Sequence, residues 1–277
     1  MKVSSHLRNT PPHRTGHSHN DEMQARPLTQ ALQDGFTSIE VDLHVMSGRL
    51  MVGHSKADAQ RLNLSLEDGY LAPLQKRVEQ FGSVYPSATE VTLMLDFKDD
   101  ARPSYAALKP LLQKYAGMLV QVHGGQAQAA PVKVVITGNQ PELESTSERS
   151  VFLDGSLLQA LRQPGSLDPS LTPTVQGNYH TFFRWNGEGK MPVGERKKLD
   201  NMVASVHSQG LQMRLWDAPD KTPAWETFVD AGVDRVNTDN LDGFANWQSV
   251  HRPSTKTWPP LARLPVQDTH ILEDARC

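Results

Sequence analysis

Two carboxylates, separated by a single valine, interrupt the apolar run Ile39-Glu40-Val41-Asp42-Leu43. In a β-strand alternate side chains face opposite sides, so Glu40 and Asp42 share one face. Two carboxylates about 4 Å apart repel each other by on the order of 4 kcal/mol at an effective dielectric constant of about 20. A divalent cation offsets this repulsion, because hard cations bind carboxylate oxygens. The pattern predicts a cation site, with a solvated acidic face on a surface strand as the alternative.

A second apolar run, Val91 to Phe97, also carries charged side chains at its carboxyl end. Asp96 and Lys98 share one face, and the apolar residues face the other way. We expect Asp96 to supply a third oxygen to the cation. Lys98 is expected to face a phosphate group or a negatively charged transition state. A simple Asp96–Lys98 ion pair at the end of the strand is the alternative.

Two histidines follow predicted strand ends near these carboxylates. His19 lies in Gly16-His17-Ser18-His19-Asn20-Asp21, and His54 ends Leu50-Met51-Val52-Gly53-His54. An imidazole titrates near neutral pH, so a pair of histidines beside a metal can divide the acid and base roles of phosphodiester cleavage. His17 is expected to be solvated or part of the core.

The second half of the chain supplies candidate substrate contacts. Arg214 and Trp216 share one face of the run 211–216. Arg214 is suited to bidentate phosphate binding, and Trp216 is expected to cover the pocket. The alternative is that Trp216 fills the core and Arg214 pairs with a carboxylate such as Asp154. Trp185 is expected in a loop over the mouth of the site.

The elements that must position these residues alternate in type from about residue 27. The predicted strands cover a weak run near 13–19 and then 37–43, 91–97, 132–137, 151–155, 179–185, 211–216 and 234–238, with a shorter one at 50–53 after a turn. The predicted helices cover 27–32, 66–81, 104–115, 194–209 and 222–231. Strands separated by crossover helices predict a parallel sheet, and eight of them close naturally into one TIM-type (β/α)8 barrel. A doubly wound sheet is the alternative.

The barrel is expected over residues 13–250, after an N-terminal segment 1–12 and before a polar, proline-rich tail 251–277 that wraps the outside. A chain of 277 residues suits this arrangement, because α/β barrels use about 250 residues as one domain. The single cysteine, Cys277, excludes an intramolecular disulfide and a cysteine-rich zinc module.

The net charge is −3, from 28 Lys and Arg residues against 31 Asp and Glu residues. This balance argues against a general nucleic-acid binder, although a small anionic substrate in a local basic pocket remains compatible with it. No run reaches the roughly 18 apolar residues of a transmembrane helix, and no secretory signal is visible. We expect a soluble protein, in the cytoplasm or secreted after trimming.

The motifs in this order, His-Asn, Glu-x-Asp, Gly-His and Asp-x-Lys, resemble the superfamily of phosphatidylinositol-phospholipase-C-like phosphodiesterases. This superfamily includes the glycerophosphodiester phosphodiesterases and the sphingomyelinase D enzymes. Residues 27–54, 70–74, 183–187 and 214–219 look like its altered-inheritance-of-mitochondria branch. The resemblance covers about residues 13–244, since the run 232–239 resembles the last strand of the superfamily.

The resemblance implies a TIM-type barrel that binds one Mg²⁺ or Ca²⁺ and hydrolyses a phosphodiester, either a small molecule or a lipid headgroup. The attacking group is water, or a substrate hydroxyl that gives a cyclic phosphate. Carried over residue by residue, it implies His19 and His54 as the acid/base pair, Glu40, Asp42 and Asp96 as metal ligands, Asn20 as a further ligand and Lys98 as the motif lysine.

The chain departs from the glycerophosphodiesterase pattern at two places. Asn20-Asp21 follows His19 where those enzymes carry Arg-Gly, and Asp96 stands where they carry glutamate. The missing arginine weakens the prediction of a glycerophosphodiester substrate. The shorter Asp96 side chain favours contact to the metal through water.

Two other classes of function compete with this prediction. His17-x-His19 on a first strand also resembles the amidohydrolase and polymerase-histidinol-phosphatase barrels, which hold metals mainly through further histidines. The runs 132–137 and 151–154 end without such a histidine. The second alternative is a catalytically inactive barrel that only binds a ligand, although the full set of candidate catalytic residues is present.

Overall fold

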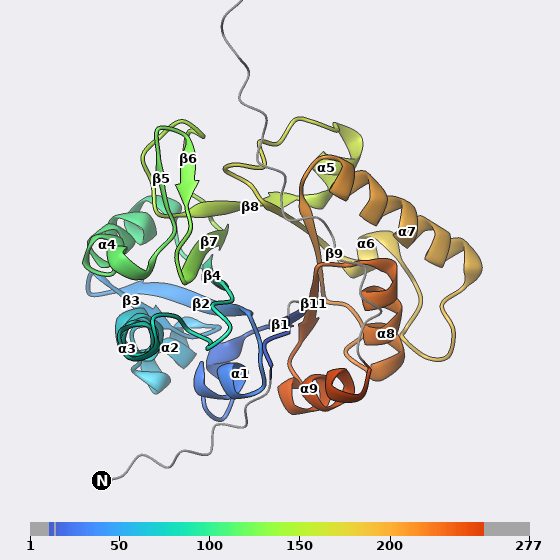
Figure 1. Ribbon diagram of the computed structural model, residues 1–277, viewed down its shortest axis with the longest axis horizontal. Coiled ribbons are helices and arrows are strands. Elements are labelled where there is room, and N and C mark those ends of the chain that lie inside the picture. Colours follow the sequence, from blue (N-terminus) through green and yellow to red (C-terminus); the bar gives the residue numbers. More distant parts are fainter. Residues whose placement is uncertain (1–10, 14, 252–277) are drawn as a thin grey trace, which may run out of the picture.

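The computed structural model describes residues 11–13 and 15–251. Eight parallel strands form a closed ring, because the first strand pairs with both the second and the last (Figure 1). The ring consists of β1 (Gly16–Ser18), β2 (Ser38–Met46), β4 (Val91–Phe97), β7 (Val132–Gly138), β8 (Phe152–Ser156), β9 (Thr174–Asn178), β10 (Gln212–Trp216) and β11 (Arg235–Thr238). This closure confirms the predicted TIM-type (β/α)8 barrel.

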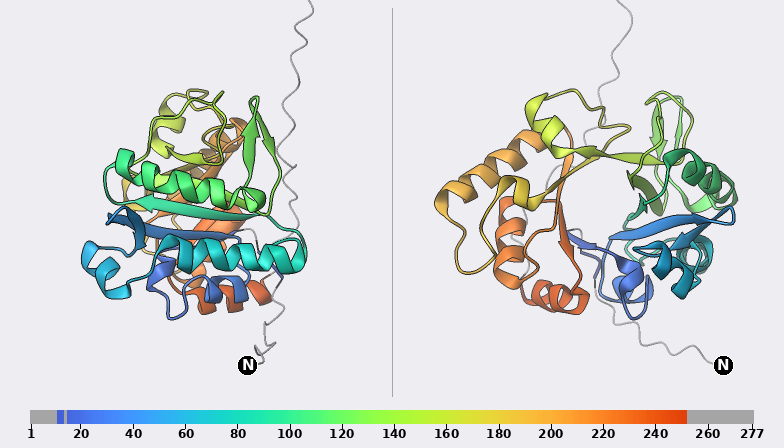
Figure 2. Two further views of the ribbon diagram at one scale, coloured as in Figure 1. Left: turned by 90° about the vertical axis from the view of Figure 1, so that its left-hand side faces the viewer. Right: turned by 180° about the vertical axis from the view of Figure 1, so that it is seen from behind.

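Helices surround the ring on its outer side, as Figure 2 shows from the side and from behind. They are α1 (Thr29–Gln33), α2 (Lys56–Leu62), α3 (Ala72–Phe81), α4 (Ala101–Lys114), α5 (Leu157–Arg162), α6 (Tyr179–Phe182), α7 (Val193–Ser208), α8 (Thr222–Ala231) and α9 (Leu241–Val250), with single turns η1 (Asp21–Met23), η2 (Glu67–Leu71) and η3 (Ala116–Met118). Ile39, Val41 and Leu43 of β2 are buried in the apolar core. Glu40 and Asp42 alternate with them, as the period of two predicts.

Two hairpins add to the ring. β3 (Arg49–Val52) pairs antiparallel with the end of β2, so the predicted strand at 50–53 lies outside the ring of parallel strands. β5 (Gln121–His123) and β6 (Gln126–Gln128) form a separate hairpin between α4 and β7. Val122 of β5 packs with Met94 and Phe152 in a second apolar cluster, which includes inward-facing residues of the barrel strands.

The predicted strand at 179–185 is wrong. The strand of this region is β9, residues 174–178, and the short helix α6 follows it directly. Val175 is the one large apolar residue of β9, whereas Tyr179 and Phe183 are large, aromatic and buried. The aromatic residues therefore gave the stronger strand signal, although they pack as part of a helix and the turn after it.

The remaining predicted strands and helices lie within a few residues of the observed ones. The sequence patterns do not predict α2, α5, α9 or the β5–β6 hairpin. Residues 1–10 and 252–277 lie outside the described part of the chain, so the N-terminal segment and the tail stay predictions. No helix within residues 15–251 is long and apolar enough to cross a membrane.

Candidate active site

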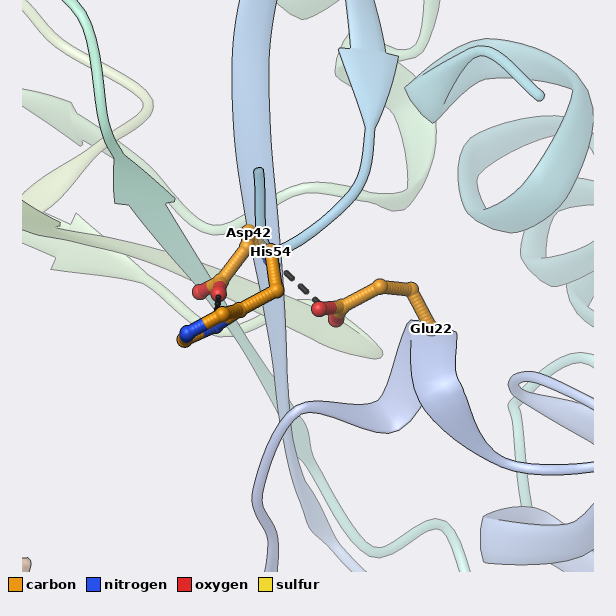
Figure 3. Close-up of side chains that lie close together, drawn as sticks. All are labelled: Glu22, Asp42 and His54. Carbon is orange, nitrogen blue, oxygen red and sulfur yellow. Dashed lines mark hydrogen bonds and ion pairs between the residues drawn. The ribbon is translucent and has the colours of Figure 1, made fainter. Parts of the chain in front are cut away.

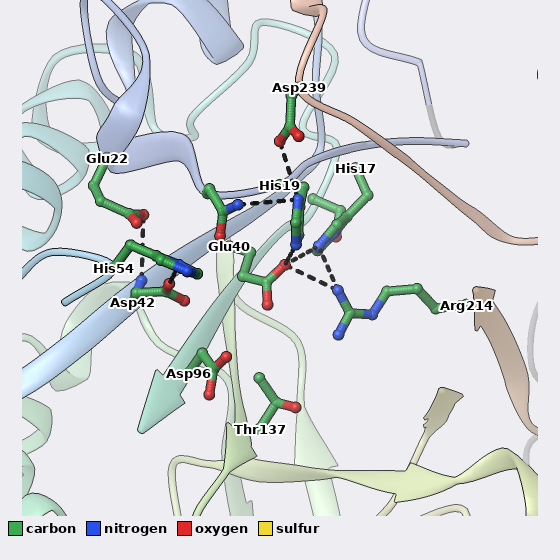
Figure 4. Close-up of polar contacts among 12 residues, drawn as sticks. His17, His19, Glu22, Glu40, Asp42, His54, Asp96, Thr137, Arg214 and Asp239 are labelled. Atoms are coloured by element: carbon green, nitrogen blue, oxygen red, sulfur yellow. Dashed lines mark hydrogen bonds and ion pairs between the residues drawn. The ribbon is translucent and has the colours of Figure 1, made fainter. Parts of the chain in front are cut away.

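Three carboxylates converge inside the barrel. Glu40 and Asp42 come from β2, and Asp96 comes from β4, where it lies in register with Asp42. One oxygen from each carboxylate lies within 4.8 Å of the others. Figure 4 shows the three side chains turned toward a common space. Carboxylate oxygens in this number and spacing suit a hard divalent cation such as Mg²⁺ or Ca²⁺. We call Glu40, Asp42 and Asp96 the carboxylate cluster.

Lys98 neutralises part of the charge of this cluster. Its ammonium nitrogen lies 2.6 Å from Asp96 Oδ2 and 3.1 Å from Asp42 Oδ1. Burial raises the pKa of Asp42, and the neighbouring carboxylates of Asp96 and Glu40 raise it further, against the opposing effect of Lys98. The Asp96–Lys98 ion pair considered from the sequence is therefore present, and Asp96 also belongs to the carboxylate cluster.

A glycine at the end of β7 makes room for Asp96. Gly138 has φ +71°, and a β-carbon there would lie 2.1 Å from Asp96 Oδ1 and 2.7 Å from the backbone oxygen of Phe97. A side chain at this position would displace the carboxylate. The backbone of β7 thus sets where Asp96 can lie.

Arg214 forms the charged centre of a buried network. Its guanidinium lies 2.9 Å from Glu40 Oε2 and 3.6 Å from Asp154 Oδ2, and the residue is only 2% exposed. Burial alone would raise the pKa of Glu40, but Arg214 and the hydrogen bond from His17 hold it well below its usual range. Burial raises the pKa of Asp154 to about 7, in spite of Arg214.

This geometry matches the alternative in which Arg214 pairs with carboxylates. Asp154 also accepts a hydrogen bond from Thr137, at 3.2 Å. Substrate binding by Arg214 and Asp154 stays a prediction, and both side chains are buried.

His17, expected from the sequence to be solvated or part of the core, is buried and belongs to the same network, a role that the sequence does not predict. Its Nε2 lies 3.0 Å from Glu40 Oε2, and its Nδ1 lies 2.7 Å from Ser38 Oγ. Burial lowers the pKa of His17 to about 4. The neutral imidazole therefore holds Glu40 in place. The alternation of β1 places His17 and His19 on the same face, and this was the signal that could have found it.

His19 lies at the edge of the carboxylate cluster. Its Nδ1 is 3.0 Å from Asp239 Oδ1, and its Nε2 is 3.9 Å from Glu40 Oε2. Burial lowers its pKa, but the hydrogen bond to Asp239 and the charge of Glu40 outweigh burial and raise it overall. The Asn20 amide nitrogen lies 3.3 Å from His19 Nδ1. The role of Asn20 as a metal ligand stays a prediction.

His54 lies on the other side of the cluster from His19 (Figure 4). Its Nδ1 is 2.7 Å from Asp42 Oδ2, and its side chain is 58% exposed. The residue before it, Gly53, lies directly against α2, because a β-carbon at Gly53 would lie 2.4 Å from the backbone nitrogen of Ala59. The start of α2 therefore packs directly against the end of β3.

Glu22 is a fourth carboxylate at this site, and the sequence patterns do not predict it. It comes from η1, and its Oε2 accepts a hydrogen bond from the backbone N–H of Asp42 at 3.3 Å. Figure 3 shows its side chain directed toward Asp42 and His54. Burial raises the pKa of Glu22 to about 8, and the charge of Asp42 adds to this effect. No strand alternation points to a residue in such a turn.

The two tryptophans differ in their position. Trp216 ends β10 and is 37% exposed, which leaves its ring accessible at the carboxyl end of the strands. Trp185 is buried in the apolar core, and its indole N–H donates to the backbone oxygen of Glu188. Substrate contact by Trp216 fits its position, whereas the burial of Trp185 does not favour such a contact.

Comparison with known families gives two matches. Residues 5–154, which are 150 of the 277 residues, match the AIM6-like phosphodiesterase domain. The chain belongs to the AIM6-like phosphodiesterase domain family. Residues 212–242 additionally match the glycerophosphoryl diester phosphodiesterase family. The branch expected from the sequence motifs is confirmed.

Yeast relatives of this AIM6-like chain are named altered inheritance of mitochondria protein 6. The protein from Lachancea thermotolerans is 27% identical over 274 residues, covering 82% of this chain and 63% of the relative. The protein from Eremothecium gossypii is 26% identical over 267 residues, covering 83% of this chain and 68% of the relative. The match thus spans less than two thirds of the length of the Lachancea protein.

Among solved structures, the glycerophosphodiester phosphodiesterase from Agrobacterium tumefaciens is similar to this chain with a TM-score of 0.48. It is 14% identical, and the match covers 86% of this chain and 100% of that one.

Proposed function

We propose that this chain is a divalent-cation-dependent phosphodiester hydrolase in which His19 and His54 carry out acid/base catalysis. The observation that carries the proposal is the carboxylate cluster with an imidazole on either side of it. Membership of a family described as a phosphodiesterase domain supports it. The donor set fits Mg²⁺ or Ca²⁺, because it consists of carboxylate oxygens.

A bound cation would supply positive charge to a non-bridging phosphate oxygen and so stabilise the transition state. The residues of the chain prepare the proton transfers. Asp42 accepts from Nδ1 of His54, so Nε2 of this exposed imidazole is free to take the proton of the nucleophile. Asp239 and Glu40 favour protonated His19, which suits the donation of a proton to the leaving alcohol. Lys98 adds a positive charge beside the cluster.

The proposal is tested with a phosphodiester that has an alkyl leaving group, such as glycerophosphocholine, because an alkyl alcohol needs a proton when it departs; the released alcohol is measured. We expect turnover with Mg²⁺ or Ca²⁺ and none after chelation. His19→Ala and His54→Ala are each expected to lower kcat by about 10²–10⁴-fold, because each removes one proton-transfer group.

His123→Ala is the matched control, because His123 is an exposed histidine on the β5–β6 hairpin. Its turnover is expected to equal that of the unaltered chain. Full turnover under chelation would refute the cation, and full turnover of either active-site variant would remove that histidine from the mechanism.

A further inference from the structure

We propose that Asp99 is a positioning residue that holds Lys98 and His54 in place beside Asp42. Lys98 contacts one oxygen of the Asp42 carboxylate, and His54 contacts the other. The two residues come from different segments, one directly after β4 and one between β3 and α2. The inference rests on the proposed function, because it gives Asp99 a part in preparing the same reaction.

The Asp99 carboxylate continues the contact between β4 and β2 beyond the end of β4. The backbone N–H of Lys98 donates to the backbone oxygen of Leu43 at 3.1 Å. The next contact uses a side chain, since the backbone N–H of Val45 donates to Asp99 Oδ2 at 2.8 Å. The backbone of Lys98 is therefore fixed to β2 both at its own N–H and through the residue that follows it.

A buried histidine orients the same carboxylate. His44 is 6% exposed, and its Nδ1 lies 3.4 Å from Asp99 Oδ1. Its Nε2 has no hydrogen-bond partner among residues 11–13 and 15–251, so the neutral ring carries its proton on Nδ1 and donates it to Asp99. Burial alone would raise the pKa of Asp99, but the hydrogen bond from Val45, Lys56 and His44 lower it overall. The carboxylate is therefore charged at neutral pH.

The carboxylate also reaches the start of α2, close to His54. Lys56 is the first residue of α2, and its Nζ lies 3.1 Å from Asp99 Oδ1. On the other side of His54, the backbone N–H of Gly53 donates to the backbone oxygen of Asp42 at 3.0 Å. His54 thus lies between a contact to β2 and a contact to Asp99. The Lys56 side chain is largely exposed, so we expect the contacts of Asp99 to β2 to have the larger effect.

A double-mutant cycle tests the proposal, with glycerophosphocholine and Mg²⁺. Asp99→Ala is expected to lower kcat by about 10-fold, because small displacements of catalytic groups slow the reaction strongly. In a chain that already carries Lys98→Met, the same change is expected to lower kcat by less than about 3-fold, since a group that Asp99 positions is gone. Asp99→Asn keeps an acceptor for Val45 and is expected to recover most of the loss.

Backbone hydrogen exchange, followed by NMR, tests the same contacts without substrate. Asp99→Ala is expected to speed exchange at the amides of Lys98 and Gly53 by about 10-fold, because the segments that carry them open more often. Exchange at Val203, which is buried in α7, is expected to stay unchanged. Faster exchange at all three amides would indicate a general loss of stability and would overturn the proposal.

Asp200→Ala is the matched control, since Asp200 is an exposed carboxylate that pairs with Arg196 on α7, and its kcat is expected to equal that of the unaltered chain. Equal losses of kcat on Asp99→Ala with and without Lys98→Met would overturn the positioning role, and so would unchanged exchange at Lys98 and Gly53. An unaltered chain without turnover would instead refute the proposed function, and the exchange rates would still decide whether Asp99 holds these segments. Should Asp99→Ala fail to fold, Asp99→Asn replaces it in both experiments.

Discussion

At the scale of single residues, the centre of the barrel is a balance of buried charges. Arg214 is almost completely buried and contacts Glu40 and Asp154 on either side. A buried charge that loses its partner is strongly destabilising, whereas exposed ion pairs contribute little. Arg214 and His17 keep the pKa of Glu40 low. Glu40 therefore carries a negative charge and can bind a cation.

Arg214→Met is expected to destabilise the fold by about 3–5 kcal/mol, because it leaves Glu40 and Asp154 buried without their counter-ion. Denaturation in urea at pH 7 measures this loss. Arg49→Met is the matched control: the Arg49–Asp68 pair is exposed, so its loss is expected to cost less than about 1 kcal/mol. Similar losses for the two variants would contradict the role of Arg214.

The site residues that could be predicted from the sequence lie in strands where polar and apolar side chains clearly alternate. Glu40, Asp42 and Asp96 interrupt apolar runs with a period of two, and their convergence follows from parallel strands. Glu22 could not be found in this way, because a turn carries no such period. Its place beside Asp42 depends on how η1 packs against β2, which only the tertiary structure defines.

At the scale of elements, neighbouring strands set the position of the ligands. Gly138 at the end of β7 lies against Asp96 at the end of β4, and the space between the two strands admits no β-carbon. The same residue has a positive φ, which glycine adopts more readily than other residues.

Gly138→Ala is expected to weaken cation binding by about 10–100-fold, because the new methyl group displaces the Asp96 carboxylate. Titration with Mn²⁺ measures the affinity. Gly124→Ala is the matched control, since Gly124 also has a positive φ but has open space around its β-carbon position. An unchanged affinity in Gly138→Ala would contradict the proposal that β7 holds Asp96 in place as a ligand.

Two physical causes explain several of the elements that the sequence patterns do not predict. The inward face of β9 carries Gln176 and Asn178, so its polar residues mask the apolar pattern of a strand. The short helices α2 and α5 have seven and six residues, too few for a clear helical period. Long helices such as α7 and apolar strands such as β4 were predicted closely, because their patterns extend over several repeats.

At the scale of the whole molecule, a cluster of aromatic rings joins the two ends of the barrel domain. His13, near the start of the described chain, packs edge-on against Phe36 and lies beside Phe244 of α9. Its Nε2 lies within hydrogen-bond distance, 3.1 Å, of the backbone oxygen of Asp34. Burial lowers the pKa of His13 from the usual 6.5 to about 4.

This shift predicts how stability depends on pH. Between about pH 6.5 and pH 4 the unfolded chain binds a proton at His13 that the folded chain does not, so the free energy of unfolding decreases as the pH falls. The difference amounts to about 3 kcal/mol for this residue. His13→Gln is expected to remove that part of the decrease, as measured by urea denaturation at a series of pH values.

Phe36→Leu is the control for this experiment, because it disturbs the same cluster of aromatic rings without removing an ionisable side chain. It is expected to lower stability by a similar amount at each pH. An unchanged pH dependence in His13→Gln would contradict burial of the neutral imidazole.

The pairing of β1 with β11 also constrains how the protein is made. The two strands lie side by side although more than 200 residues separate them along the chain. A growing polypeptide cannot complete the ring until Thr238 has left the ribosome, and until then the strand edges on both sides of the gap are exposed. His19 meets Asp239 only at that moment. A partly synthesised chain that ends before Asp239 therefore lacks the contact that positions His19.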